Sequence, residues 1–229
     1  MTAKTRKEKI DRCGSTLDLI HTDICGPLSP TALGGYKYFI TFIDDFSRFG
    51  YVELIHEKSD SLNVFKAFKA KVELQLGKPI KAVKSDRGGE YYGRYDETGR
   101  NPGPFAKFLL ECGIDEYTLP GTPQQNGVAE RRNRTLLDMV RCMLSNSSLL
   151  EFLWGEALRT AAYILNQVPS KSVLKTPYEL CAAEAWSGPI THSQRNLILK
   201  PLVVSLLAIA LDQGVPDFIV HLIPPGSLS

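Results

Sequence analysis

The chain has 229 residues, of which 43% are hydrophobic and 23% are charged, and it includes 18 glycines and 14 prolines. This composition is that of an ordinary globular protein, and it excludes global disorder, a collagen-like repeat and a coiled coil. The 27 lysines and arginines against 25 aspartates and glutamates leave a formal net charge of only +2, so composition carries no signature of nucleic-acid binding.

The cysteines and the apolar segments bear on the cellular compartment. Five cysteines are scattered through the sequence, and none of them forms a C-x-x-C pair. This number and spacing disfavour a disulfide framework and a structural zinc site, and they favour a reducing intracellular compartment. Residues 1–12 are polar and basic without an apolar stretch, so we expect no secretory signal. The longest apolar run, Leu202 to Leu211, is about half a membrane span, so we expect no transmembrane helix and no membrane partner.

The periodicity of apolar residues predicts alternating strands and helices over most of the chain. In chain order, the patterns predict strands at 17–23, 36–43, 49–55, 80–85 and 114–119 and helices at 59–76, 105–112, 128–145 and 150–167. The second and third strands form a hairpin because the link Asp45–Arg48 is short. Residues 93–104 are polar and rich in Gly and Pro, so we expect a surface loop there. This order indicates a mixed α/β fold in which helices cover a sheet.

Three acidic residues stand at positions that can place them on one edge of the sheet. Asp23 and Asp86 each end a predicted strand, and Glu130 opens a predicted helix after a loop. Mg²⁺ and Mn²⁺ prefer carboxylate oxygens, and a two-metal site supports phosphodiester chemistry. The alternative for each residue is an ordinary turn or helix-capping role. Asp44 and Asp45 are predicted turn residues of the hairpin, with support of the metal site as their alternative.

Four long sequence motifs surround these carboxylates. They read HTDICGP at 21–27, YFITFIDDFSR at 38–48, KSDRGGEY at 84–91 and TPQQNGVAERRNRTL at 122–136. Together with KTPYEL at 175–180, they closely resemble the integrase catalytic core of copia-type LTR retrotransposons, a retroviral-integrase-like family. The resemblance extends from Leu17 to Leu180.

The resemblance implies a ribonuclease-H-like α/β fold, with a five-stranded mixed sheet flanked by helices. It also implies that Asp23, Asp86 and Glu130 are both the catalytic residues and the ligands of two Mg²⁺ or Mn²⁺ ions. Enzymes of this family trim the 3′ ends of the element's DNA with water and then use the new 3′ hydroxyls to attack target DNA. Here 43 residues separate Asp86 from Glu130, more than is usual in the family. The excess falls in the 93–104 loop, which can lengthen at little thermodynamic cost.

Polar and basic residues next to Glu130 are candidates for DNA contact. The candidates are Gln125, Asn126, Arg131, Arg132 and Arg134. The two amides can hydrogen-bond DNA, with turn formation and helix capping as an equally good alternative. The three arginines place positive charge where phosphates must approach, and such contacts make affinity salt-dependent. Arg134 is one helical turn from Glu130, so an ion pair between the two is its alternative role.

The predicted organisation has three parts. They are a basic N-terminal tail (1–16), an integrase catalytic core (17–180) and a divergent C-terminal tail of unpredicted structure (181–229). Because no His/Cys zinc module precedes residue 17, we interpret the chain as a truncated core. The function expected is DNA 3′-end processing and strand transfer by a homo-oligomer on element ends and target DNA, in the nucleus or a cytoplasmic particle. The alternative is a catalytically silent remnant that at most binds nucleic acid.

Overall fold

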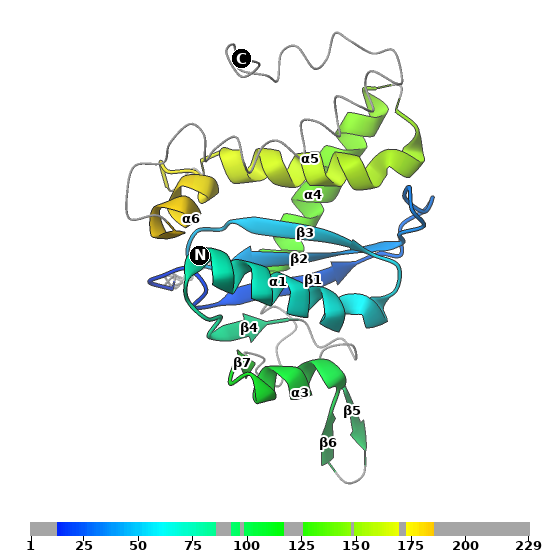
Figure 1. Cartoon of the computed structure of the whole chain (residues 1–229). Helices are drawn as coiled ribbons and strands as arrows, with labels where there is room; N and C mark the ends of the chain where they lie inside the picture. Colours follow the sequence, from blue (N-terminus) through cyan, green and yellow to red (C-terminus); the bar gives the residue numbers. More distant parts are fainter. Residues whose placement is uncertain are drawn as a thin grey trace, which may run out of the picture. The chain divides into compact units, whose positions relative to one another are not determined.

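The computed structural model describes residues 13–85, 93–96, 99–116, 126–147, 149–169 and 173–185 (Figure 1). All of these residues belong to one compact unit, Met1–Ala185. The second unit, Trp186–Ser229, lies outside the described residues. Within the described part of the chain, no helix combines the length and apolar character needed to cross a membrane.

A five-stranded mixed sheet lies at the centre of the first unit. Its strands are β1 (Ile20–Cys25), β2 (Tyr38–Asp44), β3 (Gly50–Ile55), β4 (Ala82–Lys84) and β7 (Asp115–Glu116), in the order β3-β2-β1-β4-β7. The pairs β1–β2 and β2–β3 are antiparallel, whereas β1–β4 and β4–β7 are parallel. The predicted five-stranded mixed sheet and its hairpin are therefore confirmed.

Side chains alternate between the two faces of the sheet, and each face is covered by helices (Figure 1). Ile20, Ile40 and Phe42 pack on the face covered by α1 (Ser61–Leu76) and α3 (Pro104–Glu111). Phe39 packs on the opposite face, which is covered by α4 (Gly127–Ser145) and α5 (Trp154–Gln167). The short 3-10 helices η1 (Lys58–Asp60) and η3 (Glu151–Leu153) precede α1 and α5 directly. This layered arrangement is the one that the apolar periodicity predicts.

Helix α1 shows how the sequence produces this layering. Phe65, Phe68 and Val72 recur at helical spacing, and all three are buried against the sheet. The helix ends where Gly77 adopts a left-handed conformation, with φ of 66°. Glycine takes this conformation without the steric cost that a Cβ atom would bring, so the stop signal in the sequence works through backbone geometry.

Residues 93–104 are a correction to the prediction of a loop. They contain a two-stranded antiparallel hairpin, β5 (Gly93–Asp96) and β6 (Gly99–Pro102), followed by the first residue of α3 (Figure 1). The Gly/Pro-rich composition pointed to a loop, but antiparallel pairing depends on backbone hydrogen bonds that such a sequence can still make. Proline is tolerated here because both strands of this two-stranded sheet are edge strands.

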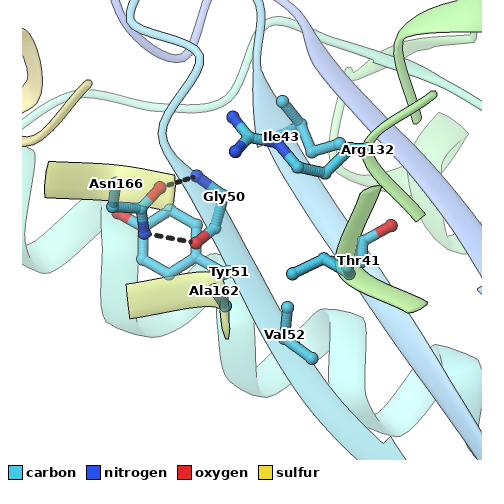
Figure 2. Close-up of a pocket in the computed structure, with 9 residues that line it drawn as sticks. Thr41, Ile43, Gly50, Tyr51, Val52, Arg132, Ala162 and Asn166 are labelled. Atoms are coloured by element: carbon cyan, nitrogen blue, oxygen red, sulfur yellow. Dashed lines mark hydrogen bonds between the residues drawn. The ribbon is translucent and has the colours of Figure 1, made fainter. Parts of the chain in front are cut away.

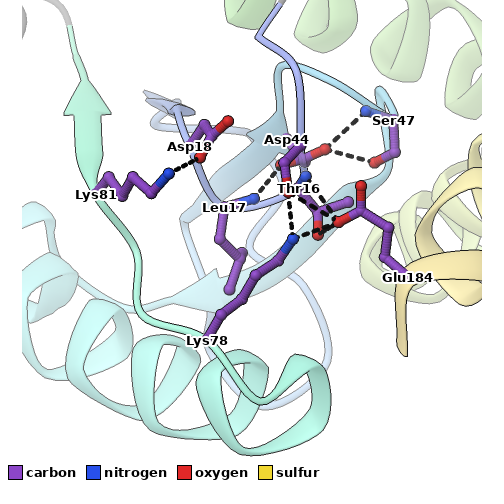
Figure 3. A network of polar contacts seen from close by, with 9 residues as sticks. Thr16, Leu17, Asp18, Asp44, Ser47, Lys78, Lys81 and Glu184 are labelled. Atoms are coloured by element: carbon purple, nitrogen blue, oxygen red, sulfur yellow. Dashed lines mark hydrogen bonds and ion pairs between the residues drawn. The ribbon is translucent and has the colours of Figure 1, made fainter. Parts of the chain in front are cut away.

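The Glu184 carboxylate connects the segments that precede and follow the predicted core to each other and to the core. Helix α6 (Pro177–Ala185) carries Glu184, whose Oε2 accepts a hydrogen bond from the Thr16 backbone N–H (3.0 Å; Figure 3). It also accepts one from the Ser15 hydroxyl (3.2 Å). The same oxygen forms an ion pair with the Lys78 ammonium just after α1. Glu184 therefore links helix α6 both to the segment before β1 and to the residue that follows Gly77.

The hydrogen bonds and the ion pair of Glu184 are expected to stabilise the fold in a pH-dependent way. Burial alone would raise the pKa of Glu184, but hydrogen bonds from Lys78 and Thr16 outweigh it and lower the pKa from 4.5 to about 2. A depressed pKa means that the carboxylate contributes stability that is complete above pH 4.5 and is lost as the pH falls toward 2. Glu184→Gln should lower the unfolding temperature at pH 7, and its difference from the wild type should shrink below pH 4.5.

Thermal unfolding followed by circular dichroism measures this difference at each pH. Glu111→Gln is the matched control, because Glu111 is an exposed residue at the end of α3. Its substitution should leave the unfolding temperature nearly unchanged. If the difference in unfolding temperature between wild type and Glu184→Gln stayed constant from pH 7 to pH 3, the stabilisation by Glu184 would not depend on its carboxylate charge.

Candidate active site

Asp23 lies near the end of β1, on the face of the sheet that α4 covers. Strand β1 directs Ile20 and Ile24 into the core beneath α1, so the alternating Asp23 points to the opposite face. In the antiparallel pairing with β2, Asp23 stands directly opposite Thr41. Paired residues in such a ladder have side chains on the same face, so the Thr41 hydroxyl and the Asp23 carboxylate are neighbours.

Helix α4 is attached to β1 at two points, and Glu130 lies between them. The Asn126 side-chain NH₂ donates to the backbone carbonyl of Thr22 (2.9 Å), and the Asn133 NH₂ donates to Asp23 Oδ2 (2.9 Å). Residues three and four apart share a helix face, so Glu130 is on the face that carries both asparagines. Glu130 is exposed, whereas both asparagines are buried. The structure thus brings Asp23 and the Glu130-bearing helix together.

Two predicted site residues, Asp86 and Gln125, lie outside the described residues. Among the residues that the structure does describe, no three His, Cys, Asp or Glu side chains lie close enough together to hold a metal ion. The described chain reaches Ser85, which is buried directly after β4. The described part of the site is therefore the pair Asp23 and Glu130, with the residues that attach them.

Asn133 and Thr41 are site residues that the sequence reading missed. The Thr41 hydroxyl donates to Asn133 Oδ1 (2.9 Å), and Asn133 in turn donates to the Asp23 carboxylate. Both residues are almost fully buried. A helical-phase argument could have found Asn133, because it lies three residues after Glu130 and projects from the same side of the helix.

The three candidate arginines of α4 differ in their surroundings. Arg131 and Arg134 are exposed. Arg132 is half-buried, and its guanidinium donates to the backbone carbonyl of Arg48. Burial and, to a smaller extent, the charge of Arg48 lower the pKa of Arg132. This guanidinium lies beside β2 and β3 (Figure 2), where it serves packing of the helix on the sheet.

The pocket around Arg132 is closely packed with side chains of the protein itself. It is lined by residues of β2, β3, α4 and α5, and it holds no space for a water-sized molecule. The Asn166 side chain of α5 accepts a hydrogen bond from the Gly50 N–H (2.9 Å) and donates to the Gly50 carbonyl (2.8 Å), as Figure 2 shows. Gly50 belongs to the edge strand β3, so Asn166 satisfies backbone groups that an edge strand would otherwise leave open.

Asp44 and Asp45 form a separate structural network. Asp44 is paired with Ile20 in the sheet, three residues and roughly 10 Å along β1 from Asp23. It accepts hydrogen bonds from the Leu17 N–H (2.8 Å) and from Ser47 (Figure 3). Burial raises its pKa, although the Ser47 bonds partly oppose that effect. The predicted turn role is thus observed for Asp44, and its distance from Asp23 argues against support of a metal site.

Asp45 binds the buried His21 ring (2.9 Å) and Arg48 (2.9 Å). Burial acts to raise the pKa of Asp45, but the hydrogen bonds from His21 and from the Cys13 N–H, with the charge of Arg48, hold it well below the ordinary value. This carboxylate joins residue 13 to the β2–β3 turn. It therefore acts as an anchor for the segment before β1.

Comparison with known proteins decides the family. Residues 16–121 match the family model described as integrase core domain. The chain is 45% identical over 155 residues to the retrovirus-related Pol polyprotein from transposon TNT 1-94 of Nicotiana tabacum, an alignment that covers 67% of this chain and 11% of that protein. The chain belongs to the integrase core domain family. Its relatives place it among the integrase catalytic cores of LTR retrotransposons.

Further relatives of this integrase core agree. It is 30% identical over 166 residues to the Pol polyprotein from transposon RE2 of Arabidopsis thaliana, covering 71% of this chain and 10% of that protein. It is 33% identical over 160 residues to the transposon Ty1-DR6 Gag-Pol polyprotein of Saccharomyces cerevisiae, covering 69% and 9%. The chain thus spans about a tenth of the length of the curated relatives that it matches.

Solved structures support the fold of this integrase core. A chain of the simian T-cell lymphotropic virus intasome, in complex with PP2A regulatory subunit B56 gamma, matches with a TM-score of 0.58 and 19% identity, covering 79% of this chain and 59% of that one. The HTLV-2 integrase catalytic core domain in complex with magnesium, in its trimeric form, matches with a TM-score of 0.50 and 20% identity, covering 74% and 99%. The ribonuclease-H-like fold expected from the sequence is therefore confirmed.

Proposed function

We propose that this integrase core catalyses metal-dependent processing of DNA 3′ ends and strand transfer, as in a copia-type element. The observation that carries the proposal is the attachment of α4 to β1 by Asn126 and Asn133 on either side of Glu130. This attachment holds a helix-borne carboxylate on the side of the sheet to which Asp23 points. Family membership supports the reaction class, and the carboxylates of Asp23 and Glu130 are the kind of ligand that this class needs.

The residues present fit a divalent-metal site. Asp23 and Glu130 offer the hard oxygen ligands that Mg²⁺ and Mn²⁺ prefer, and Glu130 is exposed. The position of Asp86 in the sequence supports it as the third ligand: Lys84 of β4 pairs with His21 of the parallel β1, and Asp86 and Asp23 each follow two residues later. When bound, two such ions supply charge that activates an attacking oxygen and stabilises the leaving one.

The test of this function is a disintegration assay, the reversal of strand transfer on a branched DNA, with Mg²⁺ or Mn²⁺ and with EDTA. Activity should require the metal and should be lost in Asp86→Asn, because the amide keeps the shape of the side chain but removes the ligand charge. Equal activity of wild type and Asp86→Asn would contradict the metal-site assignment. Metal-independent DNA binding without turnover would favour a silent binding module instead.

We propose that Arg131 and Arg134 contact DNA phosphates, because both are exposed on the helix that carries Glu130. Each single alanine substitution should weaken DNA binding at all sequences and should reduce the slope of log affinity against log salt by about 1. Fluorescence anisotropy across a salt series measures this slope. Arg159→Ala on α5 is the matched control, since Arg159 pairs with Glu156. An unchanged slope in both helix variants would contradict phosphate contact.

The remaining parts of the proposal concern assembly and setting. The HTLV-2 integrase core is described in dimeric and trimeric forms, and the simian virus protein forms an intasome. These relatives support a homo-oligomer of this chain on element ends and target DNA. For such a substrate we propose that the active protein works in the nucleus or in a cytoplasmic particle that carries the element's DNA.

A further inference from the structure

Three side chains from three different elements form a hydrogen-bonded chain that ends on Asp23. The Thr41 hydroxyl of β2 donates to Asn133 Oδ1 of α4 (2.9 Å), and the Asn133 NH₂ donates to Asp23 Oδ2 of β1 (2.9 Å). Asn133 is 3% exposed and Thr41 is fully buried. Water therefore has little access to the two inner members, and their polar groups depend on one another.

The chemistry of the groups sets the direction of this chain. An ionised carboxylate only accepts hydrogen bonds, so the Asn133 amide must turn its NH₂ toward Asp23. Its carbonyl oxygen then faces the sheet, where only a donor can satisfy it. The Thr41 hydroxyl is that donor. It also lies 3.4 Å from the Asp23 backbone carbonyl, so Thr41 is next to both Asn133 and Asp23. Thr41 thus selects the amide orientation that presents a donor to the carboxylate.

We propose that Thr41 and Asn133 are positioning residues that hold one oxygen of Asp23, leaving the carboxylate in a single orientation for the divalent ion. This inference rests on the proposed function. Partners behind a metal ligand orient it, and their loss typically weakens metal affinity by about 10- to 100-fold. Because the Thr41 hydroxyl reaches the Asp23 carboxylate through Asn133, its effect on the metal passes through the amide.

The test measures Mn²⁺ affinity of the protein alone, without DNA, by electron paramagnetic resonance of free Mn²⁺. Thr41→Val keeps the β-branched shape and removes the hydroxyl, so it should weaken Mn²⁺ binding about tenfold. Thr41→Ser restores the hydroxyl and should bind Mn²⁺ like the wild type. Asn133→Ala should also weaken binding about tenfold, and the double variant should be no weaker than Asn133→Ala, because both changes break one chain.

Thr160→Val is the matched control for a buried threonine. The Thr160 hydroxyl donates to the Glu156 carbonyl within α5 (2.9 Å), so its loss should leave Mn²⁺ affinity unchanged. Thermal unfolding in EDTA identifies variants that fail to fold. If Thr41→Val does not fold, the Mn²⁺ affinities of Asn133→Ala and Thr41→Ser decide whether the positioning role holds. Wild-type affinity in a folded Thr41→Val or Asn133→Ala, or weakened affinity in a folded Thr41→Ser, would overturn the inference.

Failure of the proposed function gives a different result. In that case the wild type would bind Mn²⁺ no better than Asp23→Asn, and the inference would fail with it. If the wild type binds Mn²⁺ and Asp23→Asn does not, the metal site stands. The behaviour of the Thr41 and Asn133 variants then decides the positioning role by itself.

Discussion

Asp23→Asn is expected to reduce metal-dependent disintegration activity by about a hundredfold or more. Catalytic metal ions contribute several kcal/mol to transition-state stabilisation, and each 1.36 kcal/mol is worth about tenfold in rate. Asparagine keeps a carbonyl oxygen that can accept the hydrogen bond from Asn133, so the packing between β1 and α4 should survive. The measurement is the initial rate on a branched DNA substrate at saturating Mn²⁺ and Mg²⁺.

The control for this substitution is Asp18→Asn. Asp18 precedes β1 and pairs with Lys81, whose side chain is largely exposed, so its change removes a surface ion pair of small energetic value. Its activity should be close to that of the wild type. If Asp23→Asn retained wild-type activity while folded, Asp23 would be a structural acceptor for Asn133 and not a metal ligand.

Phe65→Ala is expected to destabilise the fold by about 3–5 kcal/mol, the typical cost of removing a buried phenyl ring. Phe65 is fully buried on α1. Its ring contacts Phe42 of β2 and both Phe105 and Phe108 of α3, with centroid distances of 5.9, 5.0 and 6.3 Å. The substitution removes one of the aromatic contacts that join α1 and α3 to the sheet, and neighbouring rings cannot fill the space without moving.

Chemical denaturation with urea, followed by circular dichroism, measures this loss of stability. Leu74→Ala on the same helix is the control, because Leu74 is 86% exposed. Its free energy of unfolding should change by less than about 0.5 kcal/mol. Similar effects of the two substitutions would contradict the assignment of this helix face to the core.

Much of the fold could be predicted from the sequence because the relevant signals are local. Phe65, Phe68 and Val72 mark the buried face of α1 by spacing alone, and Gly77 marks its end. The hairpin of β2 and β3 follows from two β-branched runs and a short link. The β5–β6 hairpin was not predicted, because its pairing depends on backbone hydrogen bonds that composition does not reveal.

Some residues of the candidate site could likewise be predicted from local sequence, whereas the role of others depends on packing. Asp23 and Glu130 could be named from motifs, since each motif is contiguous in the sequence. Arg132 stood beside Arg131 and Arg134 as an equal candidate for DNA contact, and only packing distinguishes it: its guanidinium turns toward the sheet and binds the Arg48 carbonyl. Whether a helix residue faces the sheet or solvent depends on how the helix is docked, which its own sequence does not specify in detail.

The sequence by itself determined the order along the chain of the five strands of the main sheet and of helices α1, α3, α4 and α5. It also determined the family and the acidic residues that define the candidate site, because periodicity and motifs are properties of short segments. Only the tertiary structure decided which polar residues support those acids. Asn133 reaches Asp23 across 110 residues of chain, and Thr41 reaches Asn133 across 92. Such bonds depend on the register of β1 against β2 and on the rotation of α4, both of which are set by packing of the whole core.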